Sequence, residues 1–268
     1  LEFRRVLFRS LDTTLANIFP GFPGYGAGVT VRHLLTHTSG LVAYEDLMDP
    51  SDTLQVRDRD VLAMMASVDS TYFRPGSAYR YSNSGYAVLA MIVEKVSGVS
   101  FPDFLEENVF RPAGMKKSVA FVKGVNEVEN RAFGYAPDGN GFVFSDQSTT
   151  SAVLGDGGIY TSVADMFRWD QALYTDKLVS AEMLTRAYTS AALENGERTG
   201  YGFGWSIGDY KGRHRVYHSG STCGFRTAIH RYPDDRFTVV VLMNRRVAKP
   251  DELAEHITDI FLMDDAAK

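Results

Sequence analysis

The triplet Tyr81-Ser82-Asn83 places a phenol and a carboxamide two residues apart, and both groups donate and accept hydrogen bonds. It follows the turn Arg74-Pro75-Gly76-Ser77, in which proline has a fixed φ and glycine can adopt backbone conformations that other residues avoid. From Tyr86 the pattern becomes an apolar helix that Ser97-Gly98 ends. A rigid turn and a buried helix would hold the triplet in place. Taken alone, the triplet is more typical of a helix cap and a packed ring.

A second stretch, His218-Ser219-Gly220-Ser221-Thr222-Cys223-Gly224-Phe225, follows one expected strand and leads into another. Histidine titrates near neutral pH. The small residues would let a substrate lie along the strand edge and meet backbone N–H and C=O groups. The alternative is a glycine-rich β-bulge without a chemical role.

The elements that position these stretches are helices first and strands later. Apolar spacing predicts helices over Val31–Thr36, Asp58–Ala66, Phe101–Phe110, 163–174 and 180–188. The period then changes to two, which predicts strands over Tyr201–Gly208, Arg215–His218, Thr227–Tyr232 and Phe237–Met243. Pro233-Asp234-Asp235 is expected to turn the last hairpin, and Asp251 to cap a final covering helix. The predicted class is α+β, with an antiparallel sheet flanked by helices.

Composition narrows the classes of function. The 268 residues are 44% hydrophobic, and their net charge of −5 argues against a nucleic-acid partner. No apolar run is long enough to span a membrane. The single Cys223 excludes an internal disulfide and leaves the compartment open. The cluster Gly155-Asp156-Gly157-Gly158 has no P-loop lysine, so we expect it to allow close backbone approach around a cleft wall.

His33 and His37 are four residues apart, a spacing that puts two side chains on one helical face. Zinc could use such a pair, but the glutamate of His-Glu-x-x-His is absent and no third ligand is evident. We therefore expect two structural histidines and no metal site.

Four motifs together resemble one family. They occur in the order Arg32–Leu41 (RHLLTHTSGL), Tyr81-Ser82-Asn83, Gly157-Gly158-Ile159-Tyr160 and His218-Ser219-Gly220. This ordered set is similar to the β-lactamase-related serine hydrolases: class C β-lactamases, D-alanyl-D-alanine carboxypeptidases, D-aminopeptidases and related esterases. The resemblance implies one domain over 11–268, with a helical part at about 30–190 and a sheet with its helix at about 200–264. It implies no cofactor.

The resemblance also implies roles for individual residues. Tyr81 would carry the proton between nucleophile and leaving group, Asn83 would orient the substrate, and His218 would tune the charge of the site. The backbone N–H of Ser221 would form half of an oxyanion hole. The implied catalytic residues are Tyr81, Asn83 and His218, and the implied substrate-binding residues are Ser219, Gly220 and Ser221.

The sequence departs from the family at the nucleophile, because no serine has a lysine three residues later. In relatives the Ser-x-x-Lys helix lies just before the segment that resembles Leu11–Gly40. The arginine-rich stretch Leu1–Ser10 stands there instead and has the character of foreign sequence. We therefore expect an N-terminally truncated, inactive chain that also lacks the first strands of the sheet. The edge Phe237–Met243 would then be free to self-associate.

Two readings of function follow. The first is a fragment of a serine hydrolase of amide or ester bonds, acting on a β-lactam, D-amino-acid peptide or ester, from a periplasmic or extracellular parent. The second is a non-catalytic homologue whose cleft binds a peptide or muropeptide. Histidine in place of the family's lysine argues against a dedicated β-lactamase, since a permanent cation suits the β-lactam carboxylate better.

Overall fold

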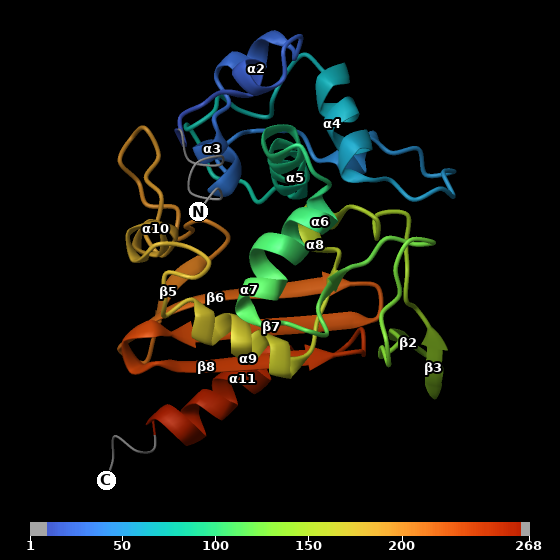
Figure 1. The fold of residues 1–268 in the computed structure, drawn as a ribbon, viewed down its shortest axis with the longest axis vertical. Helices are drawn as coiled ribbons and strands as arrows, with labels where there is room; N and C mark the ends of the chain where they lie inside the picture. Colours follow the sequence, from blue (N-terminus) through green and yellow to red (C-terminus); the bar gives the residue numbers. More distant parts are fainter. Residues whose placement is uncertain (1–9, 264–268) are drawn as a thin grey trace.

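The chain forms a helical part and an antiparallel sheet that has helices on both faces (Figure 1). This arrangement comes from a computed structural model, which describes residues 10–263. The α+β class expected from the sequence is confirmed. The expectation that Leu1–Ser10 is foreign sequence concerns residues that, apart from Ser10, lie outside the described range.

The helical part is built around α5 (Asn83–Ser97). Its buried side chains Ala87, Val88 and Ile92 belong to the main hydrophobic core. Burying each large aliphatic side chain contributes roughly 1.5–3 kcal/mol. The neighbours that complete this part of the fold are α2 (Leu15–Ile18), α3 (Val31–Leu35), α4 (Asp58–Ser67) and the short 3-10 turns Gly24–Ala27 and Tyr44–Leu47.

The start of α5 lies inside the first polar triplet. Ser82 is the N-cap, and its hydroxyl accepts a hydrogen bond from the backbone N–H of Gly85 at 3.3 Å. Gly98 ends the helix in the left-handed conformation, as predicted. The helix begins at Asn83, three residues before the expected Tyr86, because the cap satisfies its first turn. Asn83 is therefore held by a helix, and Tyr81 stands directly before the cap.

Further helices connect the helical part to the sheet. α6 (Phe101–Leu105) continues through the π-helical turn Glu106–Phe110 into α7 (Arg111–Ala113). The remaining helical segments are α8 (Leu154–Gly157), α9 (Val163–Ala172), α10 (Ala181–Ala187), α11 (Pro250–Thr258) and the π-helical turn Asp259–Met263.

The main sheet has the order β5-β6-β7-β8, antiparallel throughout. α9 lies on one face of the sheet and α11 on the other (Figure 1). Two small ribbons complete the strands: β1 (Val119–Ala120) with β4 (Ile159–Tyr160), and β2 (Tyr135–Asp138) with β3 (Gly141–Phe144). The strands of the main sheet are β5 (Ser206–Tyr210), β6 (Arg213–Thr222), β7 (Phe225–Tyr232) and β8 (Phe237–Met243).

Several predicted elements need correction. The strand expected from Tyr201 begins at Ser206, because Gly202 N–H bonds to the carbonyl of Trp205 in a turn. β6 runs on to Thr222 in unbroken register, so the bulge alternative is wrong. The N-cap of α11 is Lys249, and the Asp251 carboxylate instead accepts from His230 at 3.0 Å. The boundary expected between helical part and sheet stays a prediction.

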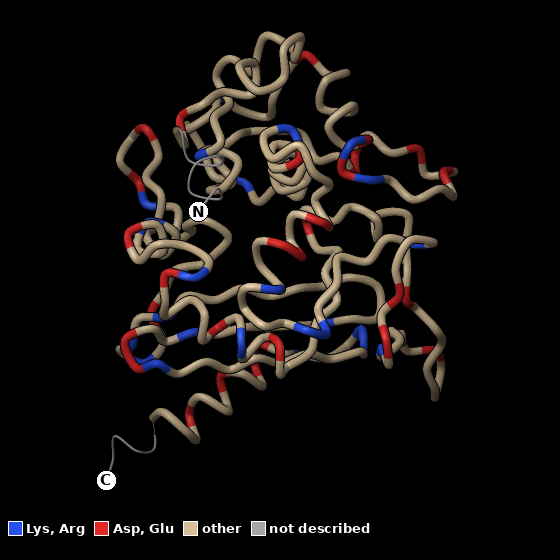
Figure 2. Tube along the Cα trace, viewed as in Figure 1, with Lys and Arg blue, Asp and Glu red and all other residues tan. Residues whose placement is uncertain are grey.

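Charged residues of both signs are interspersed along the helical part and the sheet (Figure 2). Among residues 10–263, no helix combines the length and apolar character needed to cross a bilayer. The fold therefore directs attention to the region where the helical part meets the sheet.

β8 is one of the two edge strands of the main sheet within the described part of the chain. It is rich in β-branched residues, and Leu242 is exposed. An apolar edge of this kind pairs readily with other chains. We predict that the 268-residue chain is poorly soluble or oligomeric, with a light-scattering mass of at least twice its 29.7 kDa on size-exclusion chromatography.

The control is Leu242→Lys, since charged side chains protect natural sheet edges. This substitution should shift the chain toward the monomer, as should a longer form that carries Ser-x-x-Lys. A monomer that melts cooperatively without either change would show that the edge needs no partner.

Candidate active site

The two polar stretches meet between the helical part and the sheet. Tyr81 stands before α5 and His218 lies on β6, and their rings are 6.1 Å apart between centroids. Tyr81 is half exposed, with 49% of its surface accessible. Burial of the rest of the residue raises the pKa of the Tyr81 phenol, and the nearby charge of Asp156 adds to this effect. Tyr81 is therefore protonated at neutral pH.

His218 is held as a neutral imidazole. Nδ1 donates to the carbonyl of Ser219 at 2.9 Å, so Nε2 is the acceptor for the hydroxyl of Tyr201 at 3.1 Å. Burial lowers the pKa of His218, and the Ser219 carbonyl offsets only part of that effect. The family's lysine would bring a permanent cation to this position, whereas His218 brings an uncharged ring.

His37 lies at the centre of an aromatic cage. Its ring is 4.1 Å from that of Tyr81, 4.6 Å from Tyr201 and 5.0 Å from Tyr86. His33 has a different place: its Nδ1 accepts from the Thr30 N–H, and Thr30 in turn caps α3. The expectation that both histidines share one helical face is wrong, because α3 ends before His37. Within residues 10–263, no group of three His, Cys, Asp or Glu side chains could hold a metal ion.

Two carboxylates flank Asn83 and Tyr81. Asn83 Nδ2 donates to Glu45 Oε1 at 2.8 Å, and the Tyr44 hydroxyl donates to Asp156 Oδ2 at 2.9 Å. Neither carboxylate forms an ion pair with a cation in the described part of the chain. The N-terminal end of α5 therefore lies beside two acidic groups that have no cation partner in the described part of the chain.

Burial raises the pKa of Asp156 to about 7, against the partial opposing effect of the Tyr44 hydrogen bond. An unfolded aspartate has a pKa near 3.8, so between these values only the folded chain holds the proton. Ionisation then costs the folded state about 1.4 kcal/mol for each unit of pKa difference.

We therefore predict that Asp156→Asn stabilises the fold increasingly as pH rises from about 4 to about 7. Urea unfolding of both proteins across this range measures the trend. A difference in unfolding free energy that stays constant with pH would contradict it.

β6 has a free edge beyond its pairing with β5. β5 pairs with β6 only from Arg213 to Tyr217, so 218–222 have no neighbouring strand on that side among the described residues. Gly220 packs tightly against β7, where an added Cβ would lie 2.5 Å from Thr227 Oγ1. On the β5 side, the backbone groups of 218–222 can pair with an extended ligand because no strand occupies that edge.

The side chains of Ser219 and Ser221 take no part in the meeting of Tyr81 and His218. Side chains alternate along a strand, so they lie on the opposite face from His218. There they border a cavity of about 300 Å³ next to Lys249 and Asp251 at the start of α11. Only their backbone groups can serve the cleft.

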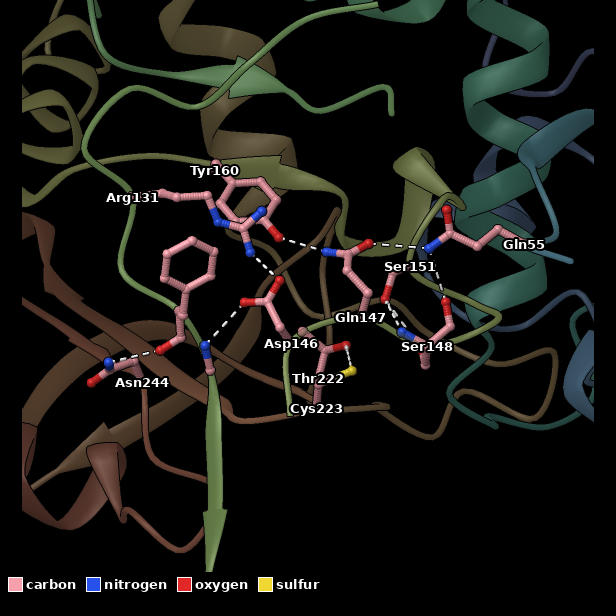
Figure 3. A network of polar contacts seen from close by, with 12 residues as sticks. Gln55, Arg131, Asp146, Gln147, Ser148, Ser151, Tyr160, Thr222, Cys223 and Asn244 are labelled. Atoms are coloured by element: carbon pink, nitrogen blue, oxygen red, sulfur yellow. Dashed lines mark hydrogen bonds and ion pairs between the residues drawn. The ribbon is translucent and has the colours of Figure 1, made fainter. Parts of the chain in front are cut away.

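A polar network lies beside the turn between β6 and β7 (Figure 3). Gly224 N–H donates to the carbonyl of Ser145 at 2.7 Å, and Gly134 N–H donates to Asp146 at 3.0 Å. The buried Asp146 also pairs with Arg131, whose guanidinium lies 4.8 Å from the Tyr160 ring centroid. The free end of β6 is thereby fixed to the loop that precedes α8.

The close backbone approach that the sequence predicts for the cluster Gly155-Asp156-Gly157-Gly158 is confirmed at Gly155. A Cβ at Gly155 would lie 2.4 Å from the carbonyl oxygen of Tyr86, so only glycine allows α8 to approach α5 this closely. Asp58 accepts from the N–H groups of Leu154 and Gly155 at 2.9 and 2.8 Å. This approach brings Asp156 next to the N-terminal end of α5.

Sequence reasoning missed four side chains near the motifs: His37 as a contact of Tyr81, and Tyr201, Glu45 and Asp156. His37 carries a local signal because it belongs to the Arg32–Leu41 motif of the resemblance, and Asp156 directly precedes the motif that begins at Gly157. Tyr201 and Glu45 lie in segments without a distinctive pattern.

Comparison with protein families matches residues 9–261 to the beta-lactamase family. A penicillin-binding protein of Bacillus subtilis (strain 168) is 36% identical over 241 residues, covering 84% of this chain and 53% of that protein. A D-aminopeptidase of Cereibacter sphaeroides is 29% identical over 241 residues, covering 88% of this chain and 46% of the relative. The chain thus spans about half the length of these relatives.

Solved structures agree in fold. The octameric penicillin-binding protein homologue from Pyrococcus abyssi superposes with a TM-score of 0.80 at 28% identity. The match covers 95% of this chain and 60% of that one.

Proposed function

The chain belongs to the beta-lactamase family, whose members are serine hydrolases acting on amide bonds, and we propose that it is a fragment of such an enzyme. The proposal extends to amide or ester substrates cleaved through an acyl-enzyme. One observation carries it: Tyr81 of the helical part and the neutral His218 of β6 converge beside a free strand edge.

The geometry supports a division of labour. The serine of a Ser-x-x-Lys segment outside these 268 residues attacks the substrate carbonyl. The phenol of Tyr81 moves the serine proton to the leaving group, and the neutral Nε2 of His218 keeps Tyr201 oriented beside it. Asn83 orients the substrate, and the backbone N–H of Ser221 stabilises the oxyanion.

The charge of the site favours a substrate without a carboxylate at this position. Glu45 places an acidic group without a cation partner beside Asn83, Asp156 is partly ionised at neutral pH because its pKa is about 7, and His218 adds no cation. An amino group complements that charge. Among the relatives, the D-aminopeptidase is the one whose name fits such a substrate.

A second candidate function is a cleft that binds a peptide or muropeptide without cleaving it. The observation that favours it is the absence of Ser-x-x-Lys from the sequence. A turnover assay separates the two, by comparing this chain with a longer form that carries Ser-x-x-Lys. Turnover by the longer form alone supports the hydrolase, and its absence from both supports the binding protein.

A further inference from the structure

His37 adopts an unusual backbone conformation in a fully enclosed place. Its φ is +56°, in the left-handed region, and only 1% of its surface is accessible. Histidine tolerates this region better than most residues with a Cβ, but not without strain. The conformation ends α3 in a left-handed C-cap, in which the N–H groups of His37 and Thr38 donate to the carbonyls of Leu34 and His33 at 3.4 and 2.9 Å.

Two hydrogen bonds from His37 bracket Tyr81. The carbonyl oxygen of His37 accepts from the backbone N–H of Arg80 at 3.0 Å. Its ring Nδ1 accepts from the backbone N–H of Ser82 at 3.1 Å. One residue therefore binds the main chain immediately before and immediately after Tyr81, using a backbone group on one side and a side-chain group on the other.

The ring of His37 also packs on the Tyr81 ring, with 38° between the two planes. The Ser82 bond requires Nδ1 to be unprotonated, so the proton of the neutral ring sits on Nε2. Burial supports this state, because it lowers the pKa of His37 to about 3. Nε2 is buried without a hydrogen-bond partner among the described residues. The imidazole is thus held as an acceptor toward the Tyr81 segment.

We propose that His37 is the positioning residue of Tyr81. It binds the main chain on both sides of Tyr81 and packs against the Tyr81 ring. The role in catalysis rests on the proposed function of Tyr81 as proton carrier. A phenol that transfers protons must be held within a fraction of an ångström of its partners, and a displacement of 1 Å can cost about 10²-fold in rate.

The test uses two substitutions that both accept a positive φ. His37→Gly removes the ring, whereas His37→Asn keeps an acceptor at the position of Nδ1. Hydrogen exchange of the Ser82 amide in the 268-residue chain, resolved by mass spectrometry with fragmentation, directly measures the hydrogen bond from Ser82 to the His37 ring. We expect exchange about tenfold faster in His37→Gly, as loss of one ordinary hydrogen bond gives, and near the original rate in His37→Asn. Amides of β7 serve as the internal reference for global stability.

A second measurement determines kcat and KM of the same variants in a longer form that carries Ser-x-x-Lys. His37→Gly should lower kcat by about 10²-fold with KM little changed, and His37→Asn should recover most of the loss. Two results would overturn the proposed hydrogen bond between Ser82 and the His37 side chain. One is an unchanged exchange rate of the Ser82 amide in His37→Gly, and the other is fast exchange of that amide in a folded His37→Asn. Equal kcat in all three proteins overturns the positioning role. A longer form without any turnover refutes the proposed function, while the exchange result still decides the hydrogen bond from Ser82 to the His37 ring.

Discussion

The 268-residue chain should not turn over p-nitrophenyl acetate or nitrocefin. The physical reason is the nucleophile, since no serine of the chain has the lysine that would activate it. In another serine hydrolase, removing the nucleophile lowered kcat on the order of 10⁶-fold. Without that activated serine, we expect no acyl-enzyme to form.

Covalent labelling makes this test sharper than a rate near background. A fluorophosphonate or penicillin probe should add no mass to this chain and one equivalent to the longer form with Ser-x-x-Lys. Stoichiometric labelling of any serine in the 268 residues would contradict the prediction. It would identify a nucleophile that the family pattern does not contain.

The sequence predicted the elements whose signals are local. β8 matches its expected range because it follows a turn and five of its seven residues have strong β-propensity. The core of α5 follows from its apolar spacing. The strand expected from Tyr201 failed where alternation continues across Gly202 and Gly204, since Gly204 has a φ of +78° and turns the chain.

The site was predictable only in part, because its contacts join distant segments. The motifs gave Tyr81 and His218, which lie 6.1 Å apart between ring centroids. They could not show that the chain turns at His37, after the end of α3, and so brings His37 to Tyr81. The four-residue spacing between His33 and His37 is the same as in a continuous helix. Nor could they show that the acidic groups of Glu45 and Asp156 both lie near the N-terminal end of α5, because no sequence pattern links residues so far apart.

Tyr81→Phe should lower kcat by about 10²–10⁴-fold in the longer form with Ser-x-x-Lys, the range typical of a group that transfers protons. Phenylalanine keeps the ring contact with His37 and loses only the hydroxyl. KM should change little, because the ring and the strand edge still hold the substrate. Stability should also be nearly unchanged, since no other residue in the described chain depends on a Tyr81 hydroxyl hydrogen bond.

Tyr79→Phe is the matched control. Tyr79 is another partly exposed phenol of the same aromatic cage, 6.2 Å from His37 between ring centroids, and it lies outside the motif. If the hydroxyl of Tyr81 carries the proton, the Tyr79 variant should keep kcat within a few-fold of the parent enzyme. Equal losses in two variants that melt at the same temperature would show that the cage acts through packing or polarity. Proton transfer would then have to be assigned to a group other than Tyr81.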